Sequence, residues 1–260
     1  MNTLRGAFDE DAELYDRMRP RYPAELVAGI VTLAGLSPRS RVLEIGPGTG
    51  QLTVPLASAG CEVTAVELGP SLAAVARRNL RDFPRAHVEV CPFEEWPLPP
   101  DPFDLVVCAT AIHWIDPAVR FTGAADALRP GGTLALVTTH HVAGGSEEFF
   151  EQVQRCYERW DPATRPGLVM PDEASTETVF DELDRPPWAG PVRASRHVRE
   201  ITYTAEQYLD LLMTYSGHRA LAPDALHGLL GCVRGLIDDR YAGRITKRYL
   251  HELLTVRKAS

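Results

Sequence analysis

The chain has 260 residues, a length that suits one large α/β domain or one domain with a small cap. Its apolar share of 45% and charged share of 24% are ordinary for a globular protein. The formal net charge of -8 argues against nucleic acid as the main partner, because surfaces that bind phosphate backbones are usually basic. There is no run of about 18 apolar residues, so we expect no membrane span.

The N-terminal segment and the cysteines bear on the cellular compartment. The first twenty residues carry charges throughout and have no apolar run of signal-peptide length. The cysteine count is odd and no two cysteines form a C-x-x-C pair, which indicates free thiols and no zinc site. We therefore expect a cytoplasmic protein with five free cysteines: Cys61, Cys91, Cys108, Cys156 and Cys232.

Residues 1–141 contain the most regular pattern of the chain. Residues 1–40 predict two helices, divided at Arg19-Pro20, and from residue 41 short apolar runs alternate with helical stretches, as in a parallel sheet with crossover helices. Ser71 is a candidate N-cap for the second of these crossover helices. The expected strands are 41–45, 61–66, 86–90, 103–109 and 133–139, and the expected helices are 51–59, 71–82 and 117–128.

The pattern changes after residue 141. A helix is expected over 144–159, and the stretch 161–191 is rich in proline and acidic residues, which is typical of an irregular insertion above the sheet. We expect a strand over 193–203, helices over 205–216 and 223–241, and a last strand at the sheet edge over 246–256. The fold class is thus α/β: a Rossmann-like, mostly parallel seven-stranded sheet in a single domain. Its parts are an N-terminal helical lid (1–40), a core (41–141), a helical cap insertion after strand five (142–191) and C-terminal strands and helices (192–260).

The strongest motif is VLEIGPGTG, in which an apolar strand ends beside Glu44 and a glycine loop follows. Glycine permits positive φ and lets the backbone approach a ligand closely, and ligands of such sheets bind beyond the carboxyl ends of the strands. A dinucleotide site has the spacing G-x-G-x-x-G, whereas here the spacing is G-x-G-x-G and Gln51 stands at the sixth position. A carboxylate at the loop also disfavours a diphosphate and favours a cationic ligand.

The loop resembles the first motif of class I S-adenosylmethionine-dependent methyltransferases. A second element, VTAVELGPSL, stands at the distance that this family has and places Glu67 at the end of the second expected strand. The resemblance implies that Glu67 accepts hydrogen bonds from both ribose hydroxyls, for which a carboxylate has two acceptor oxygens. It also implies S-adenosylmethionine as cofactor and S-adenosylhomocysteine as product. We expect no metal, because His140-His141 has no further ligands at a suitable spacing.

Further segments extend the resemblance from about residue 8 to about residue 141, most closely to the small-molecule branch that includes trans-aconitate methyltransferases. These segments are FDEDAELYDRMRPRYP, FDLVVCATAIHWIDP and ALRPGGTLAL. A departure occurs after the third strand, where Cys91-Pro92 stands in place of the usual acidic contact to the adenine amino group. We expect Glu94 to take over that contact and the backbone N–H of Phe93 to donate to the adenine ring. We expect cofactor contacts from Tyr15, Arg19, Glu44, Gly46, Pro47, Gly48, Thr49, Gly50, Gln51, Glu67, Leu68, Phe93, Glu94 and Thr110.

The methyl of a sulfonium is electrophilic, so that catalysis mainly requires an acceptor held in line with it. His113 follows the fourth strand and is our candidate for a base or an acceptor-orienting residue; a purely structural histidine is the alternative. At most one of His140 and His141 should face the site, since adjacent strand residues point to opposite faces. The expected acceptor contacts are Trp114, His140, Trp160 and Tyr215, with Trp188 as a further aromatic of the cap region.

Three functions stay open at this point. The favoured one is a methyltransferase that acts on a small molecule, with no nucleic acid or membrane partner. The second is an S-adenosylmethionine-binding protein without catalysis, and the third, less favoured, is an NAD(P)-dependent oxidoreductase. The sequence does not determine the acceptor, the methylated atom or the oligomeric state, and a homodimer stays open.

Overall fold

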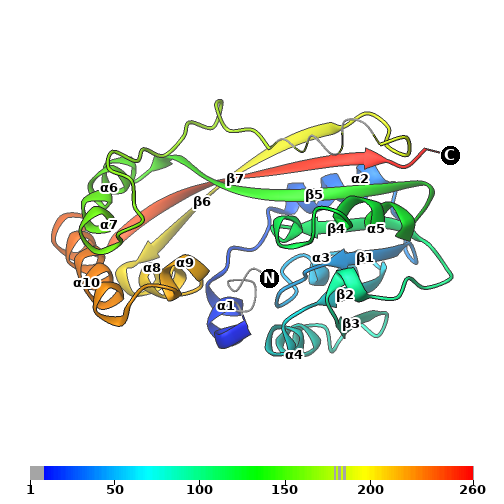
Figure 1. The fold of residues 1–260 in the computed structure, drawn as a ribbon, viewed down its shortest axis with the longest axis horizontal. Coiled ribbons are helices and arrows are strands. Elements are labelled where there is room, and N and C mark those ends of the chain that lie inside the picture. Colours follow the sequence, from blue (N-terminus) through cyan, green and yellow to red (C-terminus); the bar gives the residue numbers. More distant parts are fainter. Residues whose placement is uncertain (1–8, 179, 181–182, 184–185, 260) are drawn as a thin grey trace.

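The computed structural model describes residues 9–178, 180, 183 and 186–259. Its centre is one seven-stranded sheet in the order β3-β2-β1-β4-β5-β7-β6 (Figure 1). The four pairings from β3 to β5 are parallel, and β7 pairs antiparallel with both β5 and β6. The prediction of a mostly parallel, Rossmann-like sheet of seven strands is confirmed. The strands are β1 (Arg41–Ile45), β2 (Glu62–Glu67), β3 (Ala86–Val90), β4 (Phe103–Ala109), β5 (Leu128–Gly145), β6 (Arg193–Thr204) and β7 (Arg244–Arg257).

Helices cover both faces of the parallel half because its strands are apolar on both sides. On one face, α2 (Ala24–Ala34), α3 (Thr53–Ser58) and α4 (Pro70–Asn79) bury their apolar sides against Val42, Val63 and their neighbours. On the other face, α5 (Arg120–Ala127) and the short turns η2 (Phe93–Glu95) and η3 (Ile112–Trp114) pack against Leu43 and its neighbours. The alternation of side chains along β1 thus supplies two cores.

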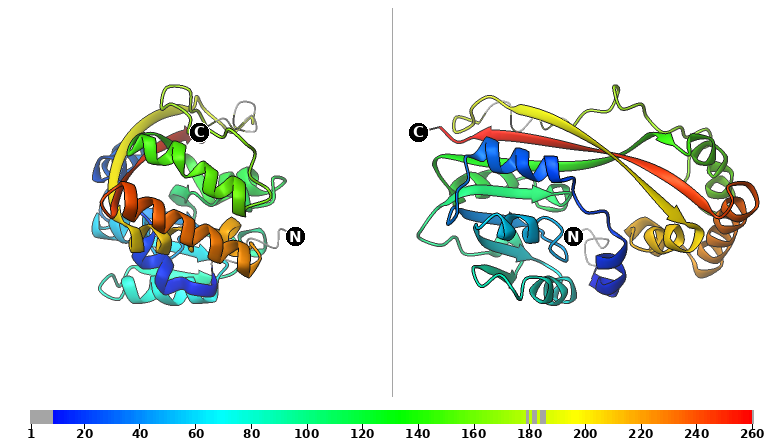
Figure 2. Two further views of the ribbon diagram at one scale, coloured as in Figure 1. Left: turned by 90° about the vertical axis from the view of Figure 1, so that its left-hand side faces the viewer. Right: turned by 180° about the vertical axis from the view of Figure 1, so that it is seen from behind.

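The other half of the molecule is a cap held on long strands. β5, β6 and β7 run well past the parallel strands and carry a cluster of helices at their far end, which makes the molecule elongated (Figures 1 and 2). The cap draws on two segments, whereas the sequence predicted only the insertion after strand five. Its helices are α6 (Glu147–Gln152), α7 (Gln154–Trp160), α8 (Ala205–Leu212), α9 (Ser216–Arg219) and α10 (Pro223–Arg240).

Several sequence-based expectations are corrected by this arrangement. β7 lies inside the sheet and β6 forms the edge, because the long β5 leaves a free side that β7 fills over ten paired residues. Ser71 is not an N-cap: α4 begins at Pro70, and the side chain of Asp9 accepts the backbone N–H of Leu72 at 2.8 Å. α5 begins at Arg120, because residues 117–119 form a turn.

The expectation of five free thiols is also wrong. Cys156 on α7 and Cys232 on α10 form a disulfide within the cap, whereas Cys61, Cys91 and Cys108 are free. The two partners are 76 residues apart in the chain, so no short motif could reveal the pairing. As for the membrane, none of the helices that the structure describes combines the length and the apolar character of a spanning segment.

Candidate functional site

The glycine loop begins where β1 ends. The backbone N–H of Gly46 donates to the carbonyl of Val66 on the neighbouring β2 at 2.9 Å, which holds the loop at the carboxyl edge of the sheet. Gly46, Gly48 and Gly50 have φ of 68, 60 and 95°, a region that favours glycine. A Cβ on Gly46 would lie 2.6 Å from the Cβ of Ala111, which is an impossible contact. The loop therefore needs glycine for its conformation and for its packing against the segment after β4.

Glu67, the last residue of β2, forms the second part of the site. Its side chain is 6% exposed, and its Oε2 accepts the N–H of Gly48 and its Oε1 the N–H of Gly69, both at 2.9 Å. Burial raises the pKa of this carboxyl, while the backbone donors, chiefly those of Gly69 and Gly48, oppose the rise. Each carboxylate oxygen has two lone-pair sites, so both oxygens can accept one further hydrogen bond.

Glu44 lies on β1 below the loop. It is 1% exposed, and its Oε2 has no hydrogen-bond partner among the described residues. Burial, and to a smaller degree the nearby charge of Glu67, raises the pKa of Glu44 to about 7. A buried carboxylate oxygen without a donor is costly unless a ligand supplies a donor or a positive charge. The two carboxylates at this end of the site, Glu44 and Glu67, consequently fit a ligand that carries a positive charge.

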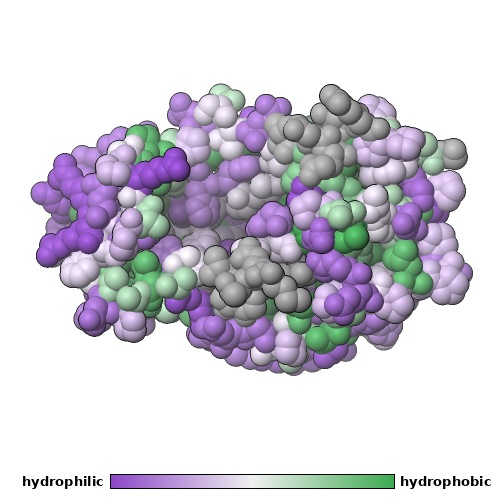
Figure 3. Space-filling model, in the orientation of Figure 1, coloured by the Kyte–Doolittle hydropathy of each residue, from purple (hydrophilic) through white to green (hydrophobic). Residues whose placement is uncertain are grey.

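The loop and both carboxylates line one cavity of about 750 Å³. It runs from Glu67 past the end of β4 to the cap helices, and the surface of the molecule is hollowed between its two ends (Figure 3). Thr110, directly after β4, lines the middle of the cavity and holds a positive φ of 57°. Strained backbone of this kind is typical of ligand sites.

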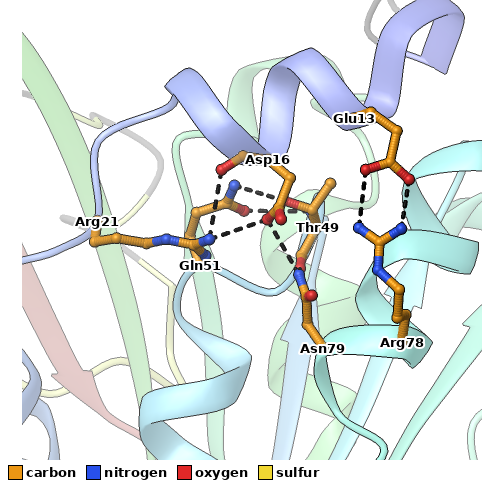
Figure 4. A network of polar contacts seen from close by, with 7 residues as sticks. All are labelled: Glu13, Asp16, Arg21, Thr49, Gln51, Arg78 and Asn79. Atoms are coloured by element: carbon orange, nitrogen blue, oxygen red, sulfur yellow. Dashed lines mark hydrogen bonds and ion pairs between the residues drawn. The ribbon is translucent and has the colours of Figure 1, made fainter.

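Helix α1 (Ala12–Met18) lies over the glycine loop, at the end of the cavity that contains Glu67 (Figure 4). Asp16 accepts the hydroxyl of Thr49 in the glycine loop at 2.8 Å and the amide of Asn79 on α4 at 3.1 Å. Just after α1, the guanidinium of Arg19 donates to the carbonyl of Thr214 at 2.7 Å and lies 4.4 Å from the ring centroid of Tyr215. The lid segment therefore contacts both the core and the cap.

The cavity brings together most of the residues that the sequence singled out. His113 and Trp114 lie in η3 beside each other, with ring centroids 4.9 Å apart, and both line the cavity. Burial, and then the positive charge of Arg120, lowers the pKa of His113 below its ordinary value. The other predicted residues that line the cavity are Tyr15, Arg19, Glu44, Gly46, Pro47, Gly48, Gln51, Glu67, Leu68, Phe93, Thr110 and Tyr215.

Five predicted residues lie outside the cavity lining. Thr49 is fully buried beneath the lid, and Gly50 turns the loop toward α3. The Glu94 carboxylate accepts the backbone N–H of Asp116 at 3.1 Å, and the Trp160 ring packs in the cap beside Gly228 of α10. His140 bonds the Thr178 hydroxyl at 2.8 Å and lies 3.8 Å from Glu252, so the prediction that this member of the histidine pair faces the site is wrong.

His141, one residue further along β5, faces the cavity instead. Its ring meets those of Tyr215 and Tyr249 edge to face, at 5.7 and 5.6 Å between centroids. Trp188, the other aromatic named for the cap region, is partly buried against the apolar core that contains Leu43. Among the described residues there is no group of three or more histidine, cysteine, aspartate or glutamate side chains that could hold a metal ion.

Sequence reasoning missed the inner face of β7. Lys247, Tyr249 and His251 alternate along this strand and all line the cavity, together with Tyr157 and His218 of the cap. The alternation is visible in the sequence, but a strand placed at the sheet edge offers no reason to assign its inner face to a site. In the structure β7 lies next to β5, between β5 and β6, so that its inner face continues the cavity wall.

Known proteins similar to this chain are methyltransferases. A family model for a methyltransferase domain matches residues 42–132. An uncharacterised methyltransferase of Mycobacterium tuberculosis is 38% identical over 172 residues, which is 65% of this chain and 66% of the relative. The chain thus spans slightly less than two thirds of the length of this relative.

Solved structures show the same fold. A structure from Anaeromyxobacter dehalogenans superposes with a TM-score of 0.59 at 24% identity, covering 93% of this chain and 97% of that one. Phosphoethanolamine N-methyltransferase 2 of Haemonchus contortus, in complex with phosphomonomethylethanolamine and S-adenosylhomocysteine, superposes with a TM-score of 0.57 at 17% identity, over 100% of this chain and 61% of that one. The match to the family model and the similarity to this relative support a class I S-adenosylmethionine-dependent methyltransferase, and the solved structures show that the chain has the fold of that family.

Proposed function

We propose that the protein binds S-adenosylmethionine and transfers its methyl group to a small-molecule acceptor. The observation that carries the proposal is Glu67, a buried carboxylate held at the end of β2 by the N–H groups of Gly48 and Gly69. A carboxylate fixed in this way presents its remaining lone pairs to two vicinal hydroxyls, such as those of a ribose.

The rest of the cofactor end supports a cationic nucleoside. Glu44, with its unpartnered Oε2, supplies negative charge where the amino-acid part of the cofactor would lie. Leu68 and Phe93 give the apolar walls that an adenine ring requires, and Tyr15 packs over Gly48, which would cover the cofactor from the lid side. A dinucleotide is disfavoured because its diphosphate would meet Glu44.

S-adenosylmethionine supplies an electrophilic methyl on a sulfonium. The chain's own task is to hold the acceptor in line with the S–CH₃ bond and to exclude water, and orientation of this kind is worth roughly 7–11 kcal/mol. The acceptor's nucleophilic atom bonds to the methyl carbon as the S–C bond breaks and its electron pair stays on sulfur. We assign to His113 the removal of a proton from the acceptor, because it lines the cavity and its lowered pKa keeps the imidazole neutral.

The shape of the site supports a small acceptor. The cavity is covered by α1 on one side and by α8 and α9 of the cap on another, so its walls come from three parts of the chain. A polymer would have to displace the lid, whose Arg19 is bonded to the cap at Thr214. The whole cavity measures about 750 Å³, and an acceptor small enough to share it with the cofactor needs no such displacement.

Calorimetric titration with S-adenosylhomocysteine and with NAD tests the cofactor assignment. We expect S-adenosylhomocysteine to bind and NAD not to bind; tighter binding of NAD would overturn the proposal. A screen of small acceptors with methyl-labelled S-adenosylmethionine then tests catalysis. Transfer to at least one acceptor is expected, whereas firm cofactor binding without any transfer would favour a binding protein.

A further inference from the structure

The cap end of the cavity contains a buried ammonium group. Lys247 on β7 is 4% exposed, and its Nζ lies 5.0 Å from the ring centroid of Phe150 and 5.8 Å from those of Tyr208 and Tyr249. Among the residues that the structure describes, no acceptor lies within hydrogen-bond distance of this Nζ and no carboxylate lies within ion-pair distance. The aromatic faces stabilise the cation in part, but they do not replace the hydrogen bonds that it loses on leaving water.

Charge is divided between the two ends of the cavity. Asp9, Glu44 and Glu67, the carboxylates among the described residues of the cavity wall, all lie at the cofactor end. The cap end has Lys247 and Arg19 instead, and burial lowers the pKa of Lys247 to about 8, so that most of it is charged at neutral pH. A ligand with a positive group at the cap end would be repelled, and one with a negative group would be attracted.

The strand geometry sets the length of such a ligand. Lys247 and His251 are four residues apart on β7, which corresponds to roughly 13 Å at the rise of an antiparallel strand. His251 meets the ring of Tyr22 edge to face at 5.6 Å, and the hydroxyl of Tyr22 lies 3.5 Å from that of Thr110 at the end of β4. The distance from Lys247 to Thr110, near which the transferred methyl group would lie, is therefore longer than one aromatic ring.

Aromatic rings form the walls along this span. Tyr249 lies between Lys247 and His251 on the same face of β7, and His141 of β5 meets it edge to face at 5.6 Å. Tyr215 belongs to the same group of rings: it lies 5.7 Å from His141, and its hydroxyl neighbours that of Tyr249. Rings of this kind favour a flat apolar body through edge-to-face and stacked contacts.

We propose that the acceptor is an elongated aromatic acid, with its acidic group paired to Lys247, its ring system packed along the wall that Tyr249 and Tyr215 form, and its nucleophilic atom near Thr110. The proposal rests on the proposed function, since the cofactor would occupy the end of the cavity that contains Glu67. It adds the chemical class of the acceptor and assigns Lys247 the role of determining specificity.

The test compares two matched probes, 4′-hydroxybiphenyl-4-carboxylate and its neutral carboxamide, by calorimetry on the protein saturated with S-adenosylhomocysteine. We expect the acid to bind about thirtyfold more tightly than the amide, because a buried charge pair is lost with the amide. Lys247→Met should abolish this preference and Lys247→Arg should retain part of it. Equal binding of acid and amide by the unmodified protein, or an undiminished preference in Lys247→Met, would overturn the proposal.

Two controls keep the result interpretable. The unmodified protein, Lys247→Met and Lys247→Arg should bind S-adenosylhomocysteine equally. If none of them binds it, the cofactor assignment is refuted, but the acid–amide comparison without cofactor still tests the role of Lys247. If Lys247→Met does not fold, reductive ¹³C-methylation gives a second readout, because the chain has only two lysines. With Lys258→Gln used to assign the signals, the acid and not the amide should shift the Lys247 resonance, and an unshifted resonance would contradict the pairing.

Discussion

The Oε2 of Glu67 accepts the backbone N–H of Gly48 at 2.9 Å, although the two residues are 19 positions apart in the chain. This hydrogen bond joins the end of β2 to the loop after β1, the two places where a parallel sheet opens to a ligand. The cofactor end of the cavity depends on this pair.

Substitution of Glu67 by glutamine should weaken S-adenosylhomocysteine binding by roughly 2–4 kcal/mol, because a charged acceptor of hydrogen bonds becomes neutral and one oxygen is replaced by a donor. The fold should persist, since the amide oxygen of the new side chain can still accept one of the two backbone donors. Isothermal calorimetry gives the affinity, and circular dichroism serves as the control for folding. An affinity equal to that of the unmodified protein would contradict the ribose assignment.

Substitution of His113 by glutamine should lower kcat about a hundredfold or more, if the imidazole removes a proton, and leave cofactor affinity unchanged. Because the pKa of His113 lies below its ordinary value of 6.5, the neutral base persists in mild acid, and activity should fall only below that pH. Steady-state rates over a pH series provide the measurement. His227→Gln, at an exposed position of α10, is the matched control; a His113 variant that behaves like it would leave the imidazole without a catalytic role.

Asp16 is expected to set how firmly the lid closes, because it receives hydrogen bonds from the glycine loop, from α4 and from Arg21, the last at 3.0 Å. Asp16→Ala should raise the dissociation rate of S-adenosylhomocysteine about tenfold. Glu13→Gln is the control on the same helix, since its ion pair with Arg78 is exposed and such pairs contribute little. Stopped-flow displacement distinguishes the two, and equal rates in both variants would mean that α1 does not retain the cofactor.

Lys247 should make the ligand-free protein more stable at alkaline pH. Its pKa in the folded state is about 8, below the ordinary 10.5, so between these values the unfolded chain binds more protons than the folded one and stability rises with pH. The gain is at most roughly 3 kcal/mol. Other titrating groups lie near Lys247 and are present in both the unmodified protein and Lys247→Met. The difference in unfolding free energy between the two proteins therefore reports the contribution of the lysine. These groups are His141, His218, Tyr208 and Tyr249.

Urea unfolding of both proteins near pH 7 and near pH 9.5 measures this difference. The unmodified protein should gain stability relative to Lys247→Met at the higher pH. A constant difference would contradict the prediction and indicate that the ammonium is as well solvated in the folded protein as in the unfolded chain.

Local signals in the sequence were sufficient for the parallel half of the molecule. The central strands β1 and β4 begin and end where the predicted runs do, because both of their faces are buried. The bounds of the edge strand β3 are also as predicted, although only Val88 of its five residues is buried. The glycine loop and Glu67 were found together for a related reason, since consecutive parallel strands bring residues about twenty positions apart to one edge.

The cap and its share of the cavity could not be predicted in the same way. Whether His140 or His141 faces the site depends on the register of β5, and this follows from its pairing with β7, more than a hundred residues later. Lys247 and Tyr249 were missed because the inner face of β7 becomes a cavity wall only when the cap helices α8 and α9 lie opposite it. These long-range contacts leave no local pattern.

A crystal structure of the protein with S-adenosylhomocysteine tests the central claim most directly. We expect the ribose hydroxyls within hydrogen-bond distance of Glu67, the amino-acid part above Gly46–Gly50 near Glu44, and the sulfur directed toward Thr110 and the cap. Density for the ligand in any other part of the molecule, or with its ribose turned away from Glu67, would contradict it.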